Sequence, residues 1–272
     1  MALEPTSVQR DKMLIHGKNK LSLVQFLVKK ESQDIQEYSR KTAMAVQEEK
    51  GSREHQLKIE QLITHGEMPY QYLTVDNFPS SQSLLLAHEN TRDIRKEYLT
   101  EAYSLIVQPS PNLKKVTRGL GFASSFLTKL LGTAEVKGIE RVQELEDHLD
   151  PDTDPDAGKV ADFASEKLDE PFYMMNLNQF QSAGKKEYNL YSARILPRLV
   201  SVGGYPNIYG KVLNTYIGDQ KSALFNRWHD FALVYYPSRT SFLRLMTNTP
   251  KGAAEIRREG LRKVVLMPST NL

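Results

Sequence analysis

Short runs of alternating apolar and polar residues recur along the first part of the chain, separated by polar stretches with helical spacing. A period of two residues is typical of half-buried strands, and a period near 3.6 is typical of amphipathic helices. The strand-like runs are 21–28, 55–63, 70–75 and 105–110. The helical patterns are 32–50 and 84–98. This stretch therefore predicts the order β-α-β-β-α-β.

The same order recurs after residue 170. Strand-like runs lie at 172–180, 208–217, 228–236 and 264–269. Helical patterns lie at 185–202 and, with a break, at 241–263. The pattern predicts an α+β protein built from two similar units.

Short local matches occupy corresponding places in the two units. In chain order they are Gln25-Phe26 with Gln179-Phe180, Glu37-Tyr38 with Glu187-Tyr188, Phe78-Pro79-Ser80 with Tyr236-Pro237-Ser238, and Pro109-Ser110 with Pro268-Ser269. One such match has no weight, but four in the same order at element boundaries indicate a tandem duplication. The alternative is two unrelated α+β units with accidental matches.

The patterns divide the chain into four segments. We expect an N-terminal tail at 1–20, a first unit at 21–110, a helical and acidic linker at 111–170, and a second unit at 171–272. The linker carries an apolar stripe at 116–130 behind basic residues, which either lies on a membrane surface or, as we prefer, packs across the barrel. The run 150–158 has the composition of an exposed, turn-rich segment.

The second unit resembles a small domain of the dimeric α+β barrel superfamily, which includes antibiotic-biosynthesis-type and haem-degrading monooxygenases and families of unknown function. The likeness is nearest to one of the latter families. It rests on Met175-Asn176-Leu177, Gly203-Gly204 and Tyr236-Pro237-Ser238-Arg239, and it covers about residues 171–270. The resemblance implies ferredoxin-like half-barrels, and two tandem copies imply an α+β barrel within one chain.

Strand alternation assigns side chains to the two faces of each predicted strand. Met175 and Leu177 form an apolar face that we expect to pack on the helices, as we do for Phe231 and Leu233. The opposite, inward face would then carry a mixture of aromatic and polar groups, which is typical of a small-molecule pocket. The expected catalytic residues are Asn176 and Asp230, and the expected substrate-binding residues are Asn178, Trp228 and Tyr236. The alternative is that these side chains only fill space between two sheets.

Haem-degrading relatives use an asparagine, a tryptophan and a histidine, and Asn176 with Trp228 resembles two members of that set. No histidine lies on the second helix of the second unit, whereas His88 lies on that helix of the first unit. A composite site is therefore an open hypothesis, and the cofactor stays unknown. No metal site is predicted, because the six histidines form no ligand spacing. The basic cluster at 257–263 is expected to be a solvated helix face.

Composition narrows the class of protein further. The chain has 272 residues, no cysteine and a net charge of +3. The absence of thiols excludes cysteine chemistry, and together with the lack of an apolar leader it favours the cytoplasm. The small net charge argues against a nucleic-acid partner, and no transmembrane segment is predicted. A homo-oligomer is left open.

Two functions remain at this point. The first is small-molecule binding, with a cofactor-independent oxygenase or isomerase acting on a small organic substrate. The second is a non-catalytic binding or assembly protein that uses the barrel as a scaffold. A cavity lined by Asn176, Trp228 and Asp230 would favour the first function, and a filled barrel interior would favour the second.

Overall fold

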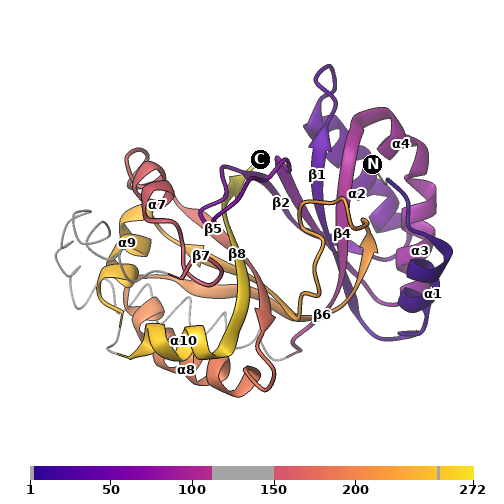
Figure 1. Cartoon of the computed structure of the whole chain (residues 1–272). Helices are drawn as coiled ribbons and strands as arrows, with labels where there is room; N and C mark the ends of the chain where they lie inside the picture. The colour runs from indigo at the N-terminus through magenta and orange to yellow at the C-terminus, as the bar shows by residue number, and fades with distance from the viewer. Residues whose placement is uncertain (1–2, 112–149, 250–251) are drawn as a thin grey trace.

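A ring of eight antiparallel strands forms the centre of the molecule, with helices on its outer surface (Figure 1). The computed structural model describes residues 3–111, 150–249 and 252–272. The strands are β1 (Leu21–Lys29), β2 (Ser52–Ile59), β3 (Tyr72–Phe78), β4 (Leu99–Pro109), β5 (Phe172–Phe180), β6 (Tyr205–Ile217), β7 (Asp230–Tyr236) and β8 (Leu261–Asn271). They follow one another around the ring as β1-β3-β2-β8-β5-β7-β6-β4.

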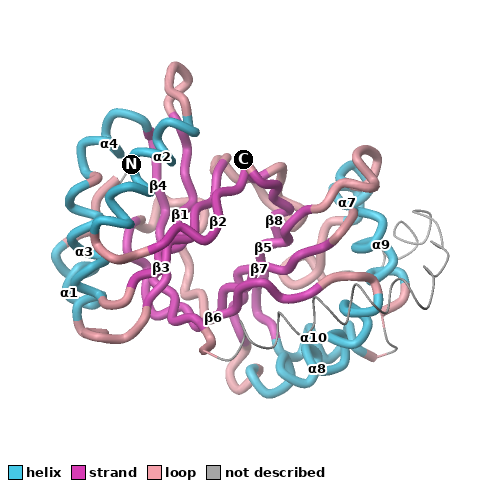
Figure 2. The backbone as a smooth tube through the Cα atoms, turned by 180° about the vertical axis from the view of Figure 1, so that it is seen from behind, coloured by secondary structure: helices cyan, strands magenta, loops and turns pink. Residues whose placement is uncertain are grey.

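Helices cover the outside of the ring in two groups, one for each half of the chain (Figure 2). The helices of the first half are α1 (Ser7–Leu14), α2 (Ile35–Glu48), α3 (Ser81–Asn90) and α4 (Arg92–Tyr98). Those of the second half are α7 (Ala157–Phe163), α8 (Lys185–Ser201), α9 (Arg239–Thr247) and α10 (Ala253–Gly260). The expected α+β class is confirmed, as is a barrel closed within one chain.

The strand-to-helix connections explain one of the repeated sequence motifs. Pro79-Ser80 follows β3 and Pro237-Ser238 follows β7, and in each pair the serine caps the start of the next helix. The Ser80 Oγ accepts from the Ser83 amide at 3.1 Å, and the Ser238 Oγ accepts from the Ser241 amide at 3.0 Å. A serine at this position satisfies a backbone donor that a helix leaves unpaired at its start.

Two seams join the halves of the ring. At one seam β4 pairs with β6 through six residue pairs, from Ser104–Ile217 to Pro109–Gly210. At the other seam β2 pairs with β8 through three, from Leu57–Asn271 to Ile59–Ser269. Beyond β2, the Glu60 and Ile63 amides donate to the Pro268 and Leu266 carbonyls, each at 3.0 Å. The shorter seam is therefore extended by loop backbone.

Three apolar clusters stabilise this arrangement. One cluster draws residues from all eight strands and from no helix, which places it inside the ring. The other two each join one half's helices to the outer face of its strands. Small barrels are usually filled by inward side chains in this way, and the helices cover much of the outer face of the strands.

Two helices depart from the expected segments. The expected tail contains α1, whose Met13 is fully buried in the outer cluster of the first half. The expected linker contains α7, whose Val160 and Phe163 are buried in the outer cluster of the second half. The apolar stripe expected at 116–130 lies outside the described residues.

The acidic run at 150–158 was wrongly expected to be fully exposed. The Asp154 side chain is buried and pairs with Arg257 Nη1 at 2.9 Å and with Arg258 Nε at 2.8 Å. The side chain of Arg257 is only 12% exposed, so that part of the basic cluster is not a solvated face either. Charge patterning alone did not reveal that the two segments pair with each other.

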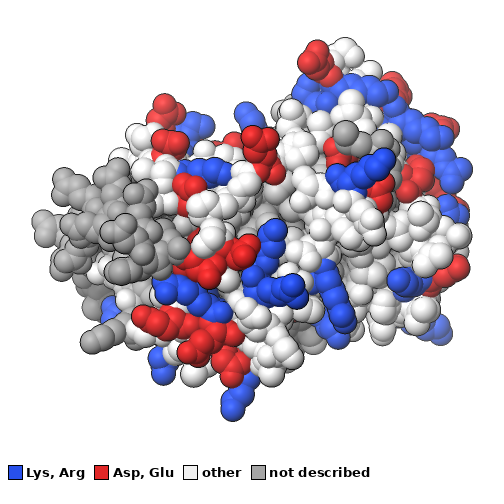
Figure 3. Space-filling view, in the orientation of Figure 1, with Lys and Arg blue, Asp and Glu red and all other residues white. Residues whose placement is uncertain are grey.

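The molecular surface in the view of Figure 3 carries acidic and basic side chains side by side over the helical layers. Among the described residues, no helix is both long enough and apolar enough to cross a membrane.

Candidate functional site

The predicted site residues do not gather inside the barrel. Asn178 donates to the Tyr188 hydroxyl on α8 at 3.1 Å, and Tyr236 belongs to the outer cluster of the second half. Asn176 and Asp230 lie on this same helix-facing side of their strands. Trp228 alone joins the interior cluster, where its indole N–H donates to the Leu224 carbonyl at 2.8 Å.

The assignment of faces was therefore wrong for four of the five residues. Met175, Leu177, Phe231 and Leu233 point into the ring, although they were expected to pack on helices. The physical reason is that both faces of these strands are buried, and the interior of the ring is the more apolar of the two. Polar side chains lie on the outer face instead, where helix residues supply hydrogen-bond partners.

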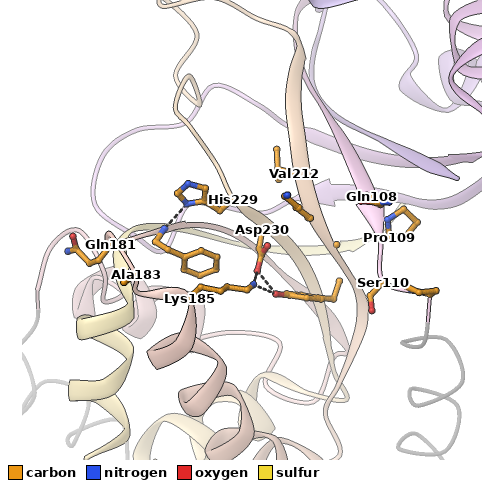
Figure 4. A pocket seen from close by; sticks show the side chains of 14 residues that line it. Gln108, Pro109, Ser110, Gln181, Ala183, Lys185, Val212, His229 and Asp230 are labelled. Carbon is orange, nitrogen blue, oxygen red and sulfur yellow. Dashed lines mark hydrogen bonds and ion pairs between the residues drawn. The ribbon is translucent and has the colours of Figure 1, made fainter. Parts of the chain in front are cut away.

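A cavity with apolar walls and a few polar groups lies outside the ring, at one end of the strands of the second half (Figure 4). It has a volume of about 770 Å³. Its walls come from the ends of β4 and β5, from the start of α8 and from adjacent parts of β6 and β7. Apolar walls include Pro109, Phe180 and Val212, and two of the polar lining residues, Lys185 and Tyr209, bond to a third, Asp230.

A lysine, an aspartate and a tyrosine form the polar centre of this cavity. The Asp230 carboxylate accepts hydrogen bonds from the Lys185 ammonium and the Tyr209 hydroxyl, and Lys185 Nζ lies 2.6 Å from the Tyr209 oxygen. The side chain of Asp230 is 5% exposed and that of Lys185 is 44% exposed. The ammonium group thus reaches the solvent-accessible space while its counter-ion stays buried.

Local structure explains why these three groups meet. Asp230 begins β7 opposite Lys211 of β6. Tyr209 lies two residues before Lys211, so its side chain is on the same face as Asp230. Lys185 is the first residue of α8, which follows β5 after a short turn. Its Nζ is also 4.5 Å from the centre of the Phe180 ring, within the range of a cation–π contact.

The protonation of the site follows from burial and charge. Burial and the Asp230 carboxylate raise the pKa of Tyr209 well above its usual range, so the phenol stays protonated and donates. Burial and the nearby Arg227 lower the pKa of His229, so its ring is neutral at pH 7. The His229 Nδ1 accepts from the Phe180 amide at 2.9 Å, and the two rings stack.

Asn176 and Tyr236 line a different cavity of about 640 Å³, between the sheet and helices α8, α9 and α10. The Asn176 amide donates to the Met174 carbonyl at 2.9 Å, which is a local contact. The Asn178 Oδ1 is buried with no hydrogen-bond partner among the described residues. Asn176 and Tyr236 therefore do not join Asp230, whereas Asn178 lies directly opposite Asp230 in the pairing of β5 with β7.

The residues compared with a haem-degrading set lie apart. Asn176 is on the outer face, Trp228 is in the interior cluster, and His88 packs against Arg95 and Tyr216 in the first half. The hypothesis of a composite site formed by these three residues is therefore wrong.

Lys185 and Tyr209 were not recognised from the sequence. A lone lysine at a helix start and a tyrosine in a mixed strand are common in structural roles. The register of β6 against β7 brings Tyr209 to Asp230, and the start of α8 after β5 brings Lys185 there. The one available signal was Asp230 itself, a carboxylate in an otherwise apolar strand.

No protein-family model matches the chain, and no curated protein matches it. Among solved structures, a protein of unknown function from Rhodopseudomonas palustris is 21% identical over 44% of this chain and 97% of its own, with a TM-score of 0.40. An anthrone oxidase-like protein is 8% identical over 94% of this chain and 92% of its own, with a TM-score of 0.43. At these similarities neither structure assigns an activity to this chain.

Proposed function

We propose that the protein binds a small, largely apolar organic molecule carrying a carbonyl or hydroxyl group in the cavity beside Lys185, Asp230 and Tyr209. The observation that carries the proposal is the convergence of this hydrogen-bonded trio on a cavity with apolar walls. Apolar walls with a few placed polar groups are typical of ligand sites. Because Asp230 neutralises Lys185, the trio favours a neutral polar group over a second charge.

The same groups suit a proton-transfer isomerisation. The Asp230 carboxylate would remove a proton from the carbon beside the ligand carbonyl, and the electron pair would move to the carbonyl oxygen, where the Lys185 ammonium donates a hydrogen bond. Return of the proton to another carbon completes the reaction without a co-reactant. In an oxygenase the same enolate would react with O₂. None of Lys185, Asp230 and Tyr209 favours this reaction with O₂.

The scaffold function is kept as a second candidate because the barrel interior is filled. The inward cluster contains Phe26, Tyr103 and Phe231, all fully buried, so a ligand inside the ring has no support. In that case the outer cavity would be an incidental surface hollow.

A binding experiment separates the two candidates. We expect 2-naphthol and 2-tetralone to bind, measured by saturation-transfer NMR and titration calorimetry, and Lys185→Met to weaken binding at least tenfold. Loss of one charge-assisted hydrogen bond of about 1.5–3 kcal/mol accounts for this. Lys186→Met, at the neighbouring exposed lysine, is the matched control and should bind like the wild type.

Exchange of the acidic protons of 2-tetralone with D₂O tests the reaction. The wild type should accelerate the exchange, and Asp230→Asn should lose at least 90% of the acceleration while remaining folded. Equal binding and equal exchange in all these variants would favour the scaffold.

We also propose that the two halves are copies of one ferredoxin-like unit, related to the dimeric α+β barrels, with boundaries near 21–110 and 171–272. Each half has the order β-α-β-β-α-β. Around the ring its four strands follow one another as β4-β1-β3-β2 and as β8-β5-β7-β6, so the fourth, first, third and second strands of each half are neighbours in the same order. The matched Pro-Ser helix caps support this origin. Superposition of the halves, with the motif pairs at equivalent positions, is the measurement that tests it.

A further inference from the structure

A second cavity of about 690 Å³ lies directly beside the first. Both are lined by Lys211, Val212 and His229, so the two cavities, together called the groove, adjoin at these residues of β6 and the start of β7. The second cavity extends to Lys12 of α1 and to the loop before β7, which contributes Phe225 and Arg227. The groove therefore runs from the second half of the chain to a helix of the first half.

The two parts of the groove differ in charge. The second cavity is lined by Lys12, Lys211 and Arg227, and no carboxylate is among its lining residues that the structure describes. In the described part of the chain, none of these three side chains forms an ion pair, and all three residues are exposed. The single carboxylate of the first cavity, Asp230, is occupied by Lys185 and Tyr209.

This one-sign lining contrasts with the mixed charges of the helical surfaces in Figure 3. Uncompensated cations around a hollow attract anions and raise their local concentration. His229 lies between the cavities, where burial, Arg227, Lys185 and Lys211 lower its pKa and Asp230 raises it. Phe225, which is 46% exposed, supplies an apolar surface beside the cations.

We propose that the groove binds one elongated ligand, with a neutral carbonyl- or hydroxyl-bearing body at Lys185 and Tyr209 and a phosphate-type group among Lys12, Lys211 and Arg227. The proposal rests on the proposed function for the position of the body. The position of the phosphate rests on the charge of the second cavity alone. The substrate class is therefore an organic phosphate ester.

The matched probes are 2-naphthol and 6-hydroxy-2-naphthyl phosphate, which keeps a free hydroxyl and carries the phosphate at the opposite end of the ring system. Titration calorimetry at low salt should give at least tenfold tighter binding of the phosphate ester, and its ³¹P resonance should shift on binding. The advantage should shrink as salt is raised, because exposed charges are screened. Arg227→Gln and Lys12→Gln should each remove about threefold to tenfold of the advantage and leave the affinity for 2-naphthol unchanged.

Lys186→Gln carries the same change in charge outside both cavities and should leave both affinities unchanged. Equal affinity for the two probes would overturn the proposal, as would an Arg227→Gln variant that weakens both probes alike. Tighter binding of a ten-residue oligothymidylate than of 6-hydroxy-2-naphthyl phosphate would also overturn it, in favour of a polyanion surface. If 2-naphthol fails to bind while the ester binds through Arg227, the proposed function fails and the phosphate subsite stands.

Discussion

His88 is a buried base held neutral by its surroundings. It is 3% exposed, and its Nε2 accepts a hydrogen bond from Arg95 Nη2 at 2.8 Å. The Arg95 guanidinium also pairs with Glu4 at 2.8 Å, which ties the N-terminal segment to α3 and α4. Burial lowers the pKa of His88 to about 4, although the neighbouring Glu4 carboxylate acts in the opposite direction.

This residue predicts how stability depends on pH. In the unfolded chain His88 titrates near 6.5, so between pH 6.5 and 4 the unfolded state binds a proton that the folded state does not. We expect the free energy of unfolding to fall as pH is lowered through this window, by up to about 3 kcal/mol. Urea unfolding at pH 7 and pH 4.5 measures it.

The substitution His88→Gln keeps an acceptor and removes the titration, so its pH profile should be flatter. His65→Gln, at a half-exposed side chain, should leave the profile unchanged. Parallel profiles for wild type and His88→Gln would contradict the assignment. Glu4 acts in a separate window: burial alone would raise its pKa, but His88 and Arg95 lower it to about 2, so its contribution is lost only below pH 4.5.

At the scale of elements, the segment before α7 is fixed to α10 by one buried carboxylate. Asp154→Ala would leave Arg257 largely buried without its counter-ion. Removing one partner of a buried ion pair is strongly destabilising, so we expect a loss of about 3 kcal/mol in urea unfolding. Asp152→Ala, at an exposed residue in the same run, should cost much less. Equal losses would show that the pairing contributes nothing specific.

The elements themselves were largely predictable because their signals are local. Alternation placed all eight strands, and the Pro-Ser pairs marked two helix starts. Helix α1 was missed because its sequence is polar and only Met13 is fully buried. The inward face was assigned wrongly for Met175 and Leu177, because alternation defines two faces without identifying the interior. Likewise, Asp230 was recognisable, but Tyr209 reaches it through the register of β6 against β7, and Lys185 reaches it through the position of α8.

At the scale of the whole molecule, a buried ion pair connects the halves beside the shorter seam. Arg239 Nη2 lies 2.5 Å from Glu60 Oε2, and its guanidinium stacks 4.2 Å from the centre of the Phe163 ring. We expect Glu60→Gln to lower the free energy of unfolding by about 3 kcal/mol. Hydrogen exchange should accelerate along β2 and β8 and remain unchanged along β4 and β6.

Glu67→Gln is the control for this experiment, because Glu67 is exposed in the same loop. Uniform acceleration around the whole ring would contradict the assignment of the pair to one seam.

The ring order also has a consequence for biosynthesis. On one side β2 pairs with β3, and on the other it pairs with β8, which follows it by roughly 200 residues. The ring therefore stays open while the intervening chain is made. Until then the first half presents an unpaired strand edge and inward side chains such as Phe26 and Leu73 to the solvent. Such intermediates associate with one another at high concentration. The yield of folded protein on refolding should therefore fall as chain concentration rises, even though the finished ring has no free edge.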